Sequence, residues 1–348
     1  MAKASNSVIG VDLGRYSLKS VLLQRKGGNR FVITNFATRA VVDPIETQEE
    51  LNRELKALFK DMGGSAKAKT CAIGVSYPGA LIRIIEQPET PPEILRDALR
   101  LNGMALLNQD CKAFVLDCDR ISTTKQTAAS EGQVGYHRYL VGGLPRTEVA
   151  QIGEAFEKNG STIGSLQLGP VCAFNAFEFA YPDVFNNEAF FLVDIGHATT
   201  TVMVGVKREL VLVRSIDFGG KPFGEALTGL SGEDFETVFT ALEQEDEVMV
   251  EYTRVALNAL VREIQNSIGF LEHRHEETIR QLYISGGVSK SRTLLKVLSE
   301  ELGLPCEMWS AATKCETALT GTQKDKFAED AVDLNVACGA AAELLKGN

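Results

Sequence analysis

Two short motifs with the same spacing place an acidic side chain and a glycine at the end of an apolar run. Gly14 follows Asp12 by two positions, and Gly196 follows Asp194 in the same way. Glycine lets a chain turn tightly, and the N–H groups exposed in such a turn can hold phosphate oxygens. Hydrated Mg²⁺ commonly takes only one or two carboxylates beside phosphates. The motifs therefore predict a Mg-phosphate site, with Asp12 and Asp194 binding the metal through water.

Hydroxyl and ammonium groups follow both motifs. Ser17, Thr199, Thr200 and Thr201 could donate to phosphate oxygens, and Lys19 could neutralise phosphate charge. Threonine is also a common strand residue, and a single Asp-x-Gly is more often an ordinary strand-to-turn signal. Because the motif occurs twice in matching surroundings, we favour the phosphate-binding interpretation.

Two glycine pairs stand between predicted strands and helices. Gly219 and Gly220 follow one apolar run, and Gly286 and Gly287 follow another. A glycine turn in this position can bring a helix N-terminus against an anion or an adenosine. Each pair alone is more often a plain strand-to-helix turn. Together with the two Asp-x-Gly motifs they indicate a nucleotide site.

Apolar runs punctuated by glycine and asparagine surround these motifs. The first copy comprises residues 8–13, 18–23 and 31–36, and the second comprises residues 191–196, 199–205 and 210–213. Short runs with such punctuation predict β-hairpins, so each Asp-x-Gly motif lies in the first turn of a β-meander. A duplicated meander predicts an α/β fold of two lobes with a cleft.

Helical periodicity occupies most of the remaining sequence. Apolar residues at helical spacing predict helices over 44–62, 170–181, 248–271 and 335–345, and strands are expected at 71–76 and 282–285. In the helix over 248–271 we expect the buried stripe to include Val248 and Val255. The stretch from Tyr77 to Gly160 opens a helix with prolines and then returns to a strand, which predicts a small inserted α/β subdomain.

The composition of the chain indicates a folded protein and limits the kinds of molecule that it could bind. The 348 residues exceed one compact core, and 44% hydrophobic with 24% charged residues is typical of a folded chain. The net charge of −10 without a basic tract argues against nucleic acid and against direct attraction to anionic lipid. Seven cysteines without CxxC spacing indicate reduced core thiols. Without a secretion signal or a long apolar span, we expect a cytoplasmic protein that meets membranes only through partners.

With these motifs in place, the chain resembles the actin/Hsp70/sugar-kinase superfamily. GVDLGRYSLK is similar to its first phosphate motif, VDIGHATTTV to its second, and LYISGGVSKSRTLLKVL to its adenosine motif. The helices over 170–181 and 335–345 stand where the superfamily has two small-residue connecting helices. The resemblance implies a bilobal actin-like ATPase fold with ATP and Mg between the lobes, and it places Glu263 near the adenosine.

Within the superfamily, the chain resembles the PilM family of type IV pilus assembly proteins and its relative FtsA. RSIDFGGKPFGEAL, EIQNSIGFLEH and IRQLYISGG are similar to PilM segments, as is VGGLPRTEVAQIGEAFEKNG at the end of the insert. The resemblance implies a scaffold at the inner membrane, in a type IV pilus or a related secretion platform. It would recruit the cytoplasmic tail of a PilN-like inner-membrane protein and other pilus assembly components.

The resemblance also implies four subdomains. Subdomain 1A is expected at 1–81, 162–187 and 331–348, the inserted subdomain 1C at 82–161, subdomain 2A at 188–230 and 281–330, and subdomain 2B at 231–280.

Several residues depart from the superfamily pattern. Arg15 and Tyr16 are bulky where the first phosphate turn usually carries small hydroxyl residues, and Val288 replaces a common third glycine. No residue is singled out as a catalytic base, so we expect at most a slow Mg-dependent ATPase. Two alternatives stay open: an FtsA-like division scaffold, disfavoured because the printed chain ends directly after the helix over 335–345, and a small-molecule kinase. A homo-oligomer is also compatible with the sequence.

Overall fold

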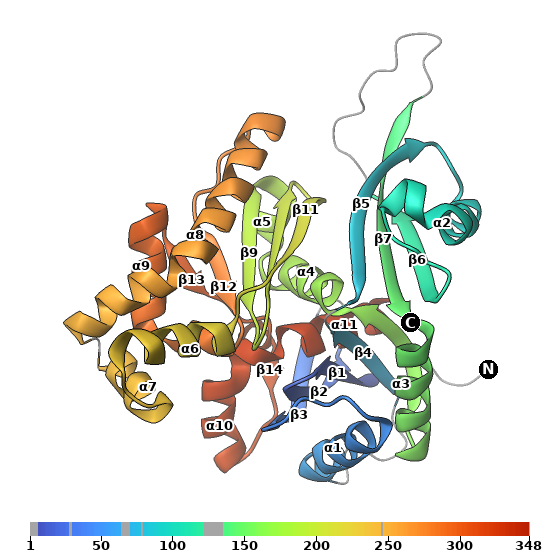
Figure 1. Ribbon diagram of the computed structural model, residues 1–348. Coiled ribbons are helices and arrows are strands. Elements are labelled where there is room, and N and C mark those ends of the chain that lie inside the picture. Colours follow the sequence, from blue (N-terminus) through green and yellow to red (C-terminus); the bar gives the residue numbers. More distant parts are fainter. Residues whose placement is uncertain are drawn as a thin grey trace. The chain divides into compact units, whose positions relative to one another are not determined.

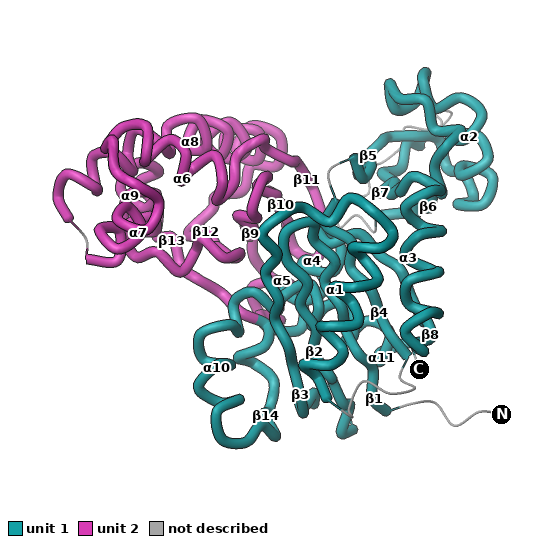
Figure 2. The backbone as a smooth tube through the Cα atoms, turned by 60° about the horizontal axis from the view of Figure 1, so that its bottom comes forward, with its two compact units in different colours: residues 1–180, 311–348 teal, residues 181–310 magenta. Residues whose placement is uncertain are grey.

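The computed structural model describes residues 6–27, 30–63, 70–77, 79–121, 135–244 and 246–347. The chain divides into two compact units. The first comprises residues 1–180 and 311–348, and the second comprises residues 181–310 (Figure 2).

A six-stranded sheet forms the centre of the first unit (Figure 1). Its strands are β1 (Ser7–Gly14), β2 (Ser17–Arg25), β3 (Phe31–Ala40), β4 (Thr70–Ser76), β8 (Thr162–Leu168) and β14 (Glu316–Thr317), in the spatial order β14-β3-β2-β1-β4-β8. Strands β1, β2 and β3 form an antiparallel meander, and β4 runs parallel to β1. The meander predicted for this part of the sequence is confirmed.

Helices pack on both faces of this sheet. On one face, α1 (Gln48–Asp61) and α3 (Arg146–Lys158) share a hydrophobic core with Ile9 and Val11 of β1. On the other face, α11 (Asn335–Lys346) lies against β1, since a Cβ at Gly10 would meet the Ala337 carbonyl oxygen of α11. Helix α4 (Gly169–Ala180) lies against β4, since a Cβ at Gly74 would lie 3.0 Å from Cys172 Sγ. The remaining short elements of this unit are α10 (Thr322–Asp330) and 3-10 turns over Ala312–Lys314 and Ala331–Leu334.

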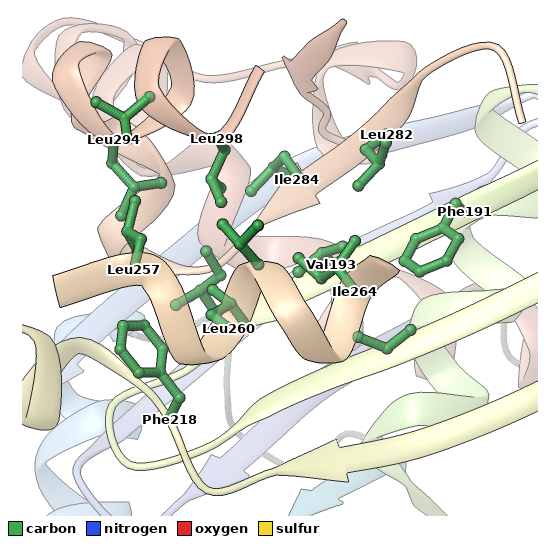
Figure 3. Packing of buried hydrophobic residues seen from close by; sticks show 14 of the residues in the cluster. Phe191, Val193, Phe218, Leu257, Leu260, Ile264, Leu282, Ile284, Leu294 and Leu298 are labelled. Carbon is green, nitrogen blue, oxygen red and sulfur yellow. The ribbon is translucent and has the colours of Figure 1, made fainter. Parts of the chain in front are cut away.

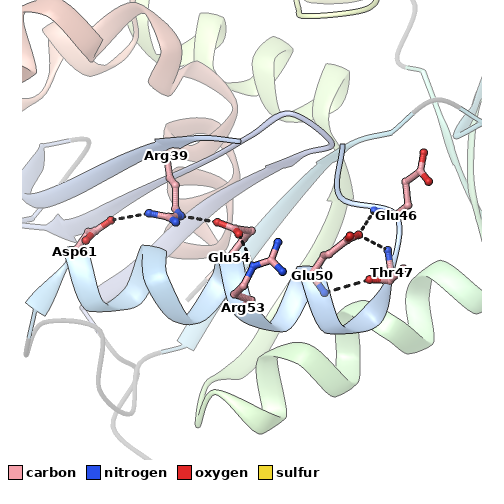
Figure 4. Close-up of polar contacts among 7 residues, drawn as sticks. All are labelled: Arg39, Glu46, Thr47, Glu50, Arg53, Glu54 and Asp61. Atoms are coloured by element: carbon pink, nitrogen blue, oxygen red, sulfur yellow. Dashed lines mark hydrogen bonds and ion pairs between the residues drawn. The ribbon is translucent and has the colours of Figure 1, made fainter. Parts of the chain in front are cut away.

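Helix α1 begins at Gln48, later than the predicted start at 44, because Thr47 caps it. The Thr47 hydroxyl accepts from the Glu50 N–H at 3.2 Å, and the Glu50 carboxylate accepts from the Thr47 N–H at 2.9 Å (Figure 4). Further along α1, the buried Glu54 carboxylate accepts from Arg39 Nε at 2.6 Å and from Arg53 Nε at 2.9 Å. These two arginines satisfy a carboxylate that would otherwise be costly to bury.

The helices α4 and α11 approach each other very closely. Gly339 of α11 has no side chain, and a Cβ there would lie 1.8 Å from the Cys172 carbonyl oxygen of α4. Alanines 340, 341 and 342 continue the small-residue surface and are buried. The two small-residue helices expected from the sequence are therefore confirmed as elements, and glycine allows their close contact.

The inserted segment has a sheet of its own. Strands β5 (Leu81–Pro88), β7 (Tyr136–Pro145) and β6 (Phe114–Arg120) lie in that order, and α2 (Pro92–Leu107) packs on them through Leu95 and Leu99. This confirms an inserted α/β element. Helix α3 lies within the range 82–161 predicted for the insert, yet its buried residues join the core of the main sheet, where Phe156 contacts Phe59 at 5.9 Å between ring centroids.

The second unit repeats the sheet of the first. Strands β9 (Ala189–Ile195), β10 (Thr200–Val206), β11 (Glu209–Ile216), β12 (Leu282–Ser285) and β13 (Cys306–Met308) lie in the order β11-β10-β9-β12-β13. Position by position this equals β3-β2-β1-β4-β8, with the same antiparallel meander and the same parallel strand beside the first. The duplication predicted from the Asp-x-Gly motifs is therefore confirmed for the sheets.

The helices of the second unit are α5 (Pro182–Asn187), α6 (Gly220–Ser231), α7 (Phe235–Glu243), α8 (Glu247–His275) and α9 (Arg292–Leu302). Leu257, Leu260 and Ile264 of α8 pack between the sheet and α9 (Figure 3). The prediction that Val248 and Val255 belong to the buried stripe was wrong, because they are 57% and 58% exposed. No helix within the described ranges combines the length and the apolar character needed to span a membrane.

Two boundaries differ from the expected ones. Residues 311–330 were assigned to subdomain 2A with 281–310, but they belong to the first unit, where β14 pairs with β3. Residues 181–187 were assigned to subdomain 1A and belong to the second unit. Both differences arise because a segment's unit is decided by strand pairing and packing with residues far away in the sequence, and not by local composition. The finer division of the second unit stays a prediction.

Candidate functional site

Asp12 lies at the end of β1 and is only 4% exposed. Lys19 Nζ donates to Asp12 Oδ2 at 3.0 Å from the facing position of β2. Ser76, at the end of neighbouring β4, donates through Oγ to Asp12 Oδ1 at 3.3 Å. Asp12 and Lys19 were both selected from the sequence, and the structure places them in contact. Ser76 was missed, because only the parallel pairing of β1 and β4 brings it to Asp12.

The turn after Asp12 is tight. A Cβ at Gly14 would lie 2.9 Å from the Ser17 carbonyl oxygen, closer than real Cβ contacts allow. Gly14, Ser17, Asp12 and Lys19 therefore gather at one end of the β1–β2 hairpin.

Arg15 occupies the same turn, and its side chain contacts three other parts of the first unit. Nη1 donates to the Ile45 carbonyl oxygen at 2.5 Å, and Nη2 donates to Glu148 Oε1 at 2.6 Å. The guanidinium carbon lies 4.2 Å from the centroid of the Tyr77 ring, in cation–π contact. Burial raises the pKa of Tyr77 to about 12, so its hydroxyl stays neutral. The side chain of Arg15, which is bulky where the superfamily's turn usually carries a small residue, is thus held by other groups of the first unit.

In the second unit, Asp194 lies at the end of β9. Ser285 Oγ, from the facing position of β12, donates to Asp194 Oδ1 at 2.8 Å. Asp12 and Ser76, on the equivalent strands β1 and β4, make a similar contact, but Ser285 lies directly opposite Asp194 whereas Ser76 lies opposite Gly14, two residues beyond Asp12. The position of Lys19 is taken in the second unit by Thr201, which faces Asp194 on β10. Each aspartate therefore accepts from a serine of the neighbouring parallel strand, although the two serines are not equivalent in register.

Three glycine-containing segments of the second unit pack against one another. A Cβ at Gly219 would lie 2.7 Å from the carbonyl oxygens of Gly196 and His197. A Cβ at Gly220 would lie 2.8 Å from Val288 Cγ2, and one at Gly286 would lie 2.1 Å from the Ile195 carbonyl oxygen. The φ of Gly286 is +92°, which also favours glycine.

The N-terminus of α6 binds the β9–β10 turn. The N–H of Gly220 donates to the Gly196 carbonyl at 2.9 Å, the N–H of Lys221 donates to the His197 carbonyl at 2.8 Å, and Pro222 has no N–H. A helix normally leaves its first N–H groups available to an anion. We selected Gly219 and Gly220 because the N-terminus of the following helix could face an anion. That reason is corrected here, because the N–H groups of Gly220 and Lys221 donate to the β9–β10 turn.

Other selected residues of the second unit have separate roles. Thr200 is fully buried and donates through Oγ1 to the Phe218 carbonyl at 2.7 Å, so its hydroxyl stabilises the fold and is not exposed to phosphate. The Thr199 carbonyl accepts from the Gly196 N–H at 3.0 Å within the turn. Glu263 lies on α8 and pairs with Arg214 Nη2 of β11 at 3.1 Å. Gly287 begins the 3-10 turn Gly287–Lys290, which precedes α9.

His197 lies in the β9–β10 turn. Partial desolvation of its imidazole and the charge of the neighbouring Lys221 hold the pKa of His197 below the usual 6.5. At neutral pH the ring is therefore uncharged, and any contact with phosphate would be a hydrogen bond and not an ion pair.

The described residues do not form a cluster of side chains that could bind a metal ion directly. Among the described residues, no group of three or more His, Cys, Asp or Glu side chains is placed to hold a metal ion. The seven cysteines are free thiols. Each oxygen of Asp12 still has lone-pair capacity beyond its one hydrogen bond, so the carboxylate fits the water-mediated contact that Mg²⁺ favours.

The first unit also contains an open groove of about 530 Å³ between the inserted sheet and the main sheet. Its walls come from β5, β6, β7, β8, α3 and α4, and most of its lining is apolar. The apolar lining residues include Ile82, Val115, Leu116, Leu144, Val149, Leu168 and Val171. Arg96, Asp117 and Asp119 add charged groups. Gly142 and Gly143 of β7 line the groove without side chains.

The two equivalent sheets, each with an aspartate at the end of its first strand, define the actin-like ATPase fold. Two solved structures are similar over nearly the whole chain. "PilM-PilN type IV pilus biogenesis complex" matches with a TM-score of 0.80 and 20% identity, covering 99% of each chain. Ethanolamine utilization protein EutJ from Carboxydothermus hydrogenoformans matches with a TM-score of 0.54 and 13% identity, covering 97% of this chain and 91% of that chain.

The family model of the type IV pilus assembly protein PilM matches residues 171–344, half of the chain. The chain belongs to the PilM family of type IV pilus assembly proteins. No curated protein sequence matches it. The family assignment confirms the resemblance drawn from the sequence motifs and favours the pilus protein over the FtsA-like alternative.

Proposed function

We propose that this protein is an ATP-binding scaffold of the type IV pilus inner-membrane platform that recruits the cytoplasmic tail of a PilN-like membrane protein. The observation that carries the proposal is the apolar groove beside the inserted sheet, in a chain of the PilM family. The solved relative is described as a PilM–PilN complex, which indicates the kind of partner. The protein would lie on the cytoplasmic face of the inner membrane, held there by this tail.

The groove suits a short peptide. Ligand pockets usually measure about 300–1,000 Å³, and apolar walls supply most of their affinity. Side chains of an extended tail would bury apolar surface against Val115, Leu168 and Val171, while Arg96 and Asp117 would fix charged or backbone groups. Among the described strands β6 lies at an edge of the inserted sheet, so the tail would lie beside backbone groups that the described strands do not pair with on that side.

For the nucleotide, we propose that the β1–β2 and β9–β10 turns bind the phosphates of Mg-ATP. Lys19 would neutralise phosphate charge, Ser17 and the backbone around Gly14 would donate to phosphate oxygens, and Asp12 would orient metal-bound water. Asp194 would do the same from the second unit. Bound Mg-ATP would favour the conformer that it binds more tightly, and we expect hydrolysis to be slow at most, because the sequence singles out no residue as a catalytic base.

The groove is tested with a synthetic peptide of the PilN-like tail from the same organism. Val115 is 42% exposed and lines the groove, so Val115→Asp should weaken peptide binding by about tenfold or more without unfolding the protein. Val42 is 96% exposed, belongs to the same unit and does not line the groove, so Val42→Asp is the matched control. Equal affinity of both variants, measured by calorimetry, would remove the groove from the proposal.

Nucleotide binding is tested separately by calorimetry with Mg-ATP. Asp12→Asn should lower the affinity in the presence of Mg²⁺ more than in EDTA, because the carboxylate acts through the metal. Asp43 is an exposed aspartate of the same unit, and Asp43→Asn should leave the affinity unchanged. An Asp12→Asn protein that binds Mg-ATP as tightly as wild type would contradict the assignment of Asp12.

A further inference from the structure

Helix α8 carries apolar side chains on two opposite sides. Leu257, Leu260 and Ile264 pack in the core between the sheet and α9 (Figure 3). Val248 and Val255 lie on the other side of the helix, because each residue is turned by about 100° from the one before it. They are 57% and 58% exposed, whereas a helix at the surface normally carries polar residues on its outer side. The described part of the chain therefore leaves one apolar side of α8 uncovered.

The exposed apolar residues of α8 have the spacing of a helix–helix contact. Tyr252 is half-buried between the two valines, and Ala259 is exposed one turn beyond Val255. We call Val248, Tyr252, Val255 and Ala259 the outer stripe. Their spacings alternate between four and three residues, as the contact positions of a coiled coil do. The outer stripe extends over about three turns and therefore suits one partner helix.

The segment that contains the start of the outer stripe is strongly acidic. Residues 222–253, which run from α6 through α7 into α8, contain nine Asp and Glu residues and no Lys or Arg. At its two ends, Lys221 lies 4.0 Å from Glu225 and Arg254 lies 3.6 Å from Glu251. These two cations still leave a large excess of negative charge, so this one segment carries nearly all of the net charge of −10.

Glu251 is well placed to select a partner helix. It lies between Val248 and Val255 at the edge of the outer stripe, and its side chain is 69% exposed. In a coiled coil, residues at such flanking positions pair with charges of the facing helix and decide which helix binds. A Lys or Arg of the partner would meet Glu251 there, and the acidic segment would attract such a helix from a distance.

We propose that the outer stripe docks an amphipathic helix of a partner protein that has apolar residues at the same spacing and Lys or Arg beside them. A second copy of this chain would bring two acidic segments together, and an anionic lipid surface would be repelled, so neither fits as well. The inference does not depend on the groove or on the nucleotide, because the outer stripe shares no residue with the groove lining or with the Asp-x-Gly turns. It adds a docking surface on the second unit to the groove of the first unit.

The probe is a synthetic peptide of about three heptads with Leu at the contact positions and Lys at the flanking positions, where repulsion between the lysines opposes pairing of the peptide with itself. Its affinity for the full chain is measured by fluorescence anisotropy. Replacing both valines, Val248→Ser with Val255→Ser, should weaken binding by about tenfold or more, because less apolar surface is buried. Glu251→Lys should weaken binding by about fivefold and make the affinity less dependent on salt.

Two matched controls separate the outer stripe from general effects of charge and composition. Glu272→Lys makes the same change of charge at an exposed position of the same helix, about 30 Å from Glu251 along the helix axis. Val42→Ser removes a valine that is 96% exposed in the first unit. Both variants should bind the peptide within about twofold of wild type. Because every substituted side chain is exposed, all variants should keep the far-UV circular dichroism of wild type.

A second peptide with Glu in place of Lys should bind wild type at least about tenfold more weakly. Equal binding of the two peptides, no binding of the Lys peptide, or unchanged affinity in the double valine variant would overturn the proposal. Sedimentation of the protein alone tests the other occupant. A dimer that forms with rising concentration and is lost in the double valine variant would make a second copy the occupant, and would also overturn the proposal.

Discussion

Gly339→Ala should destabilise the protein, although alanine is the better helix former. Gly339 lies inside α11, where replacing glycine by alanine normally stabilises a helix by about 1 kcal/mol. Here the new Cβ would lie 1.8 Å from the Cys172 carbonyl oxygen and 2.7 Å from the carbonyl carbon. Ordinary contact between heavy atoms is about 3.5 Å, so α4 and α11 would have to separate.

The size of the effect follows from what blocks the methyl group. Overpacking a core usually costs about 1–3 kcal/mol, and the obstacle here is a helix backbone that cannot rotate away as a side chain can. We therefore take the upper end of that range, about 3 kcal/mol, and subtracting the gain of about 1 kcal/mol in helix propensity leaves an expected loss of about 2 kcal/mol in the free energy of unfolding. At a slope of about 2 kcal/mol per molar urea, the unfolding midpoint should fall by about 1 M.

The matched control is Gly153→Ala in α3 of the same unit, where no atom lies within 4 Å of the new Cβ. It should raise the urea midpoint, by up to about 0.5 M. Far-UV circular dichroism follows both units, whereas fluorescence of Trp309, the single tryptophan, follows the second unit. The loss in Gly339→Ala should therefore be seen in the dichroism.

If Gly339→Ala were as stable as wild type while Gly153→Ala was stabilised, the close crossing of α4 and α11 would be refuted. If both variants were destabilised equally, the cause would be a general cost of alanine at these positions and not the contact with Cys172.

Three further predictions concern polar groups whose surroundings stabilise them or shift their pKa. Desolvation raises the pKa of Glu54, but hydrogen bonds from Arg53 and Arg39 outweigh this effect and hold the pKa below its usual value. The ionised Glu54 therefore stabilises the folded protein at a pH above the pKa of the unfolded chain, and this stabilisation is lost as the pH falls through the folded pKa. Glu54→Gln should cost about 1 kcal/mol at pH 7 and less below about pH 4, by urea unfolding at each pH. Thr200→Val leaves the Phe218 carbonyl unsatisfied and should cost about 1–2 kcal/mol in the Trp309 fluorescence transition; no loss would contradict the hydrogen bond. By NMR titration, His197 should have a pKa below 6.5 that rises in Lys221→Gln, and an unchanged midpoint would exclude the influence of that lysine.

Local patterns were sufficient for the meanders, the connecting helices and the insert. Strand alternation, glycine punctuation and helical spacing depend on neighbours in sequence, so the β1–β2 and β9–β10 hairpins could be placed with their Asp-x-Gly turns. The prediction that Val248 and Val255 belong to the buried face of α8 was wrong. In a long amphipathic helix, more than one set of apolar residues at helical spacing could form the buried face. Only packing against the sheet and α9 chooses among them.

The sequence by itself determined the duplicated hairpins, the actin-like class and the selection of Asp12, Lys19 and Asp194, because these depend on residue order. Only the tertiary structure decided which distant groups serve those residues. Ser76 and Ser285 reach the aspartates through parallel strand pairing, and Glu148 reaches Arg15 across the first unit. The N–H groups at the start of α6 are likewise bound by a turn that precedes them in the chain. Such contacts join residues far apart in sequence, and their distances are set by how the sheets and helices pack.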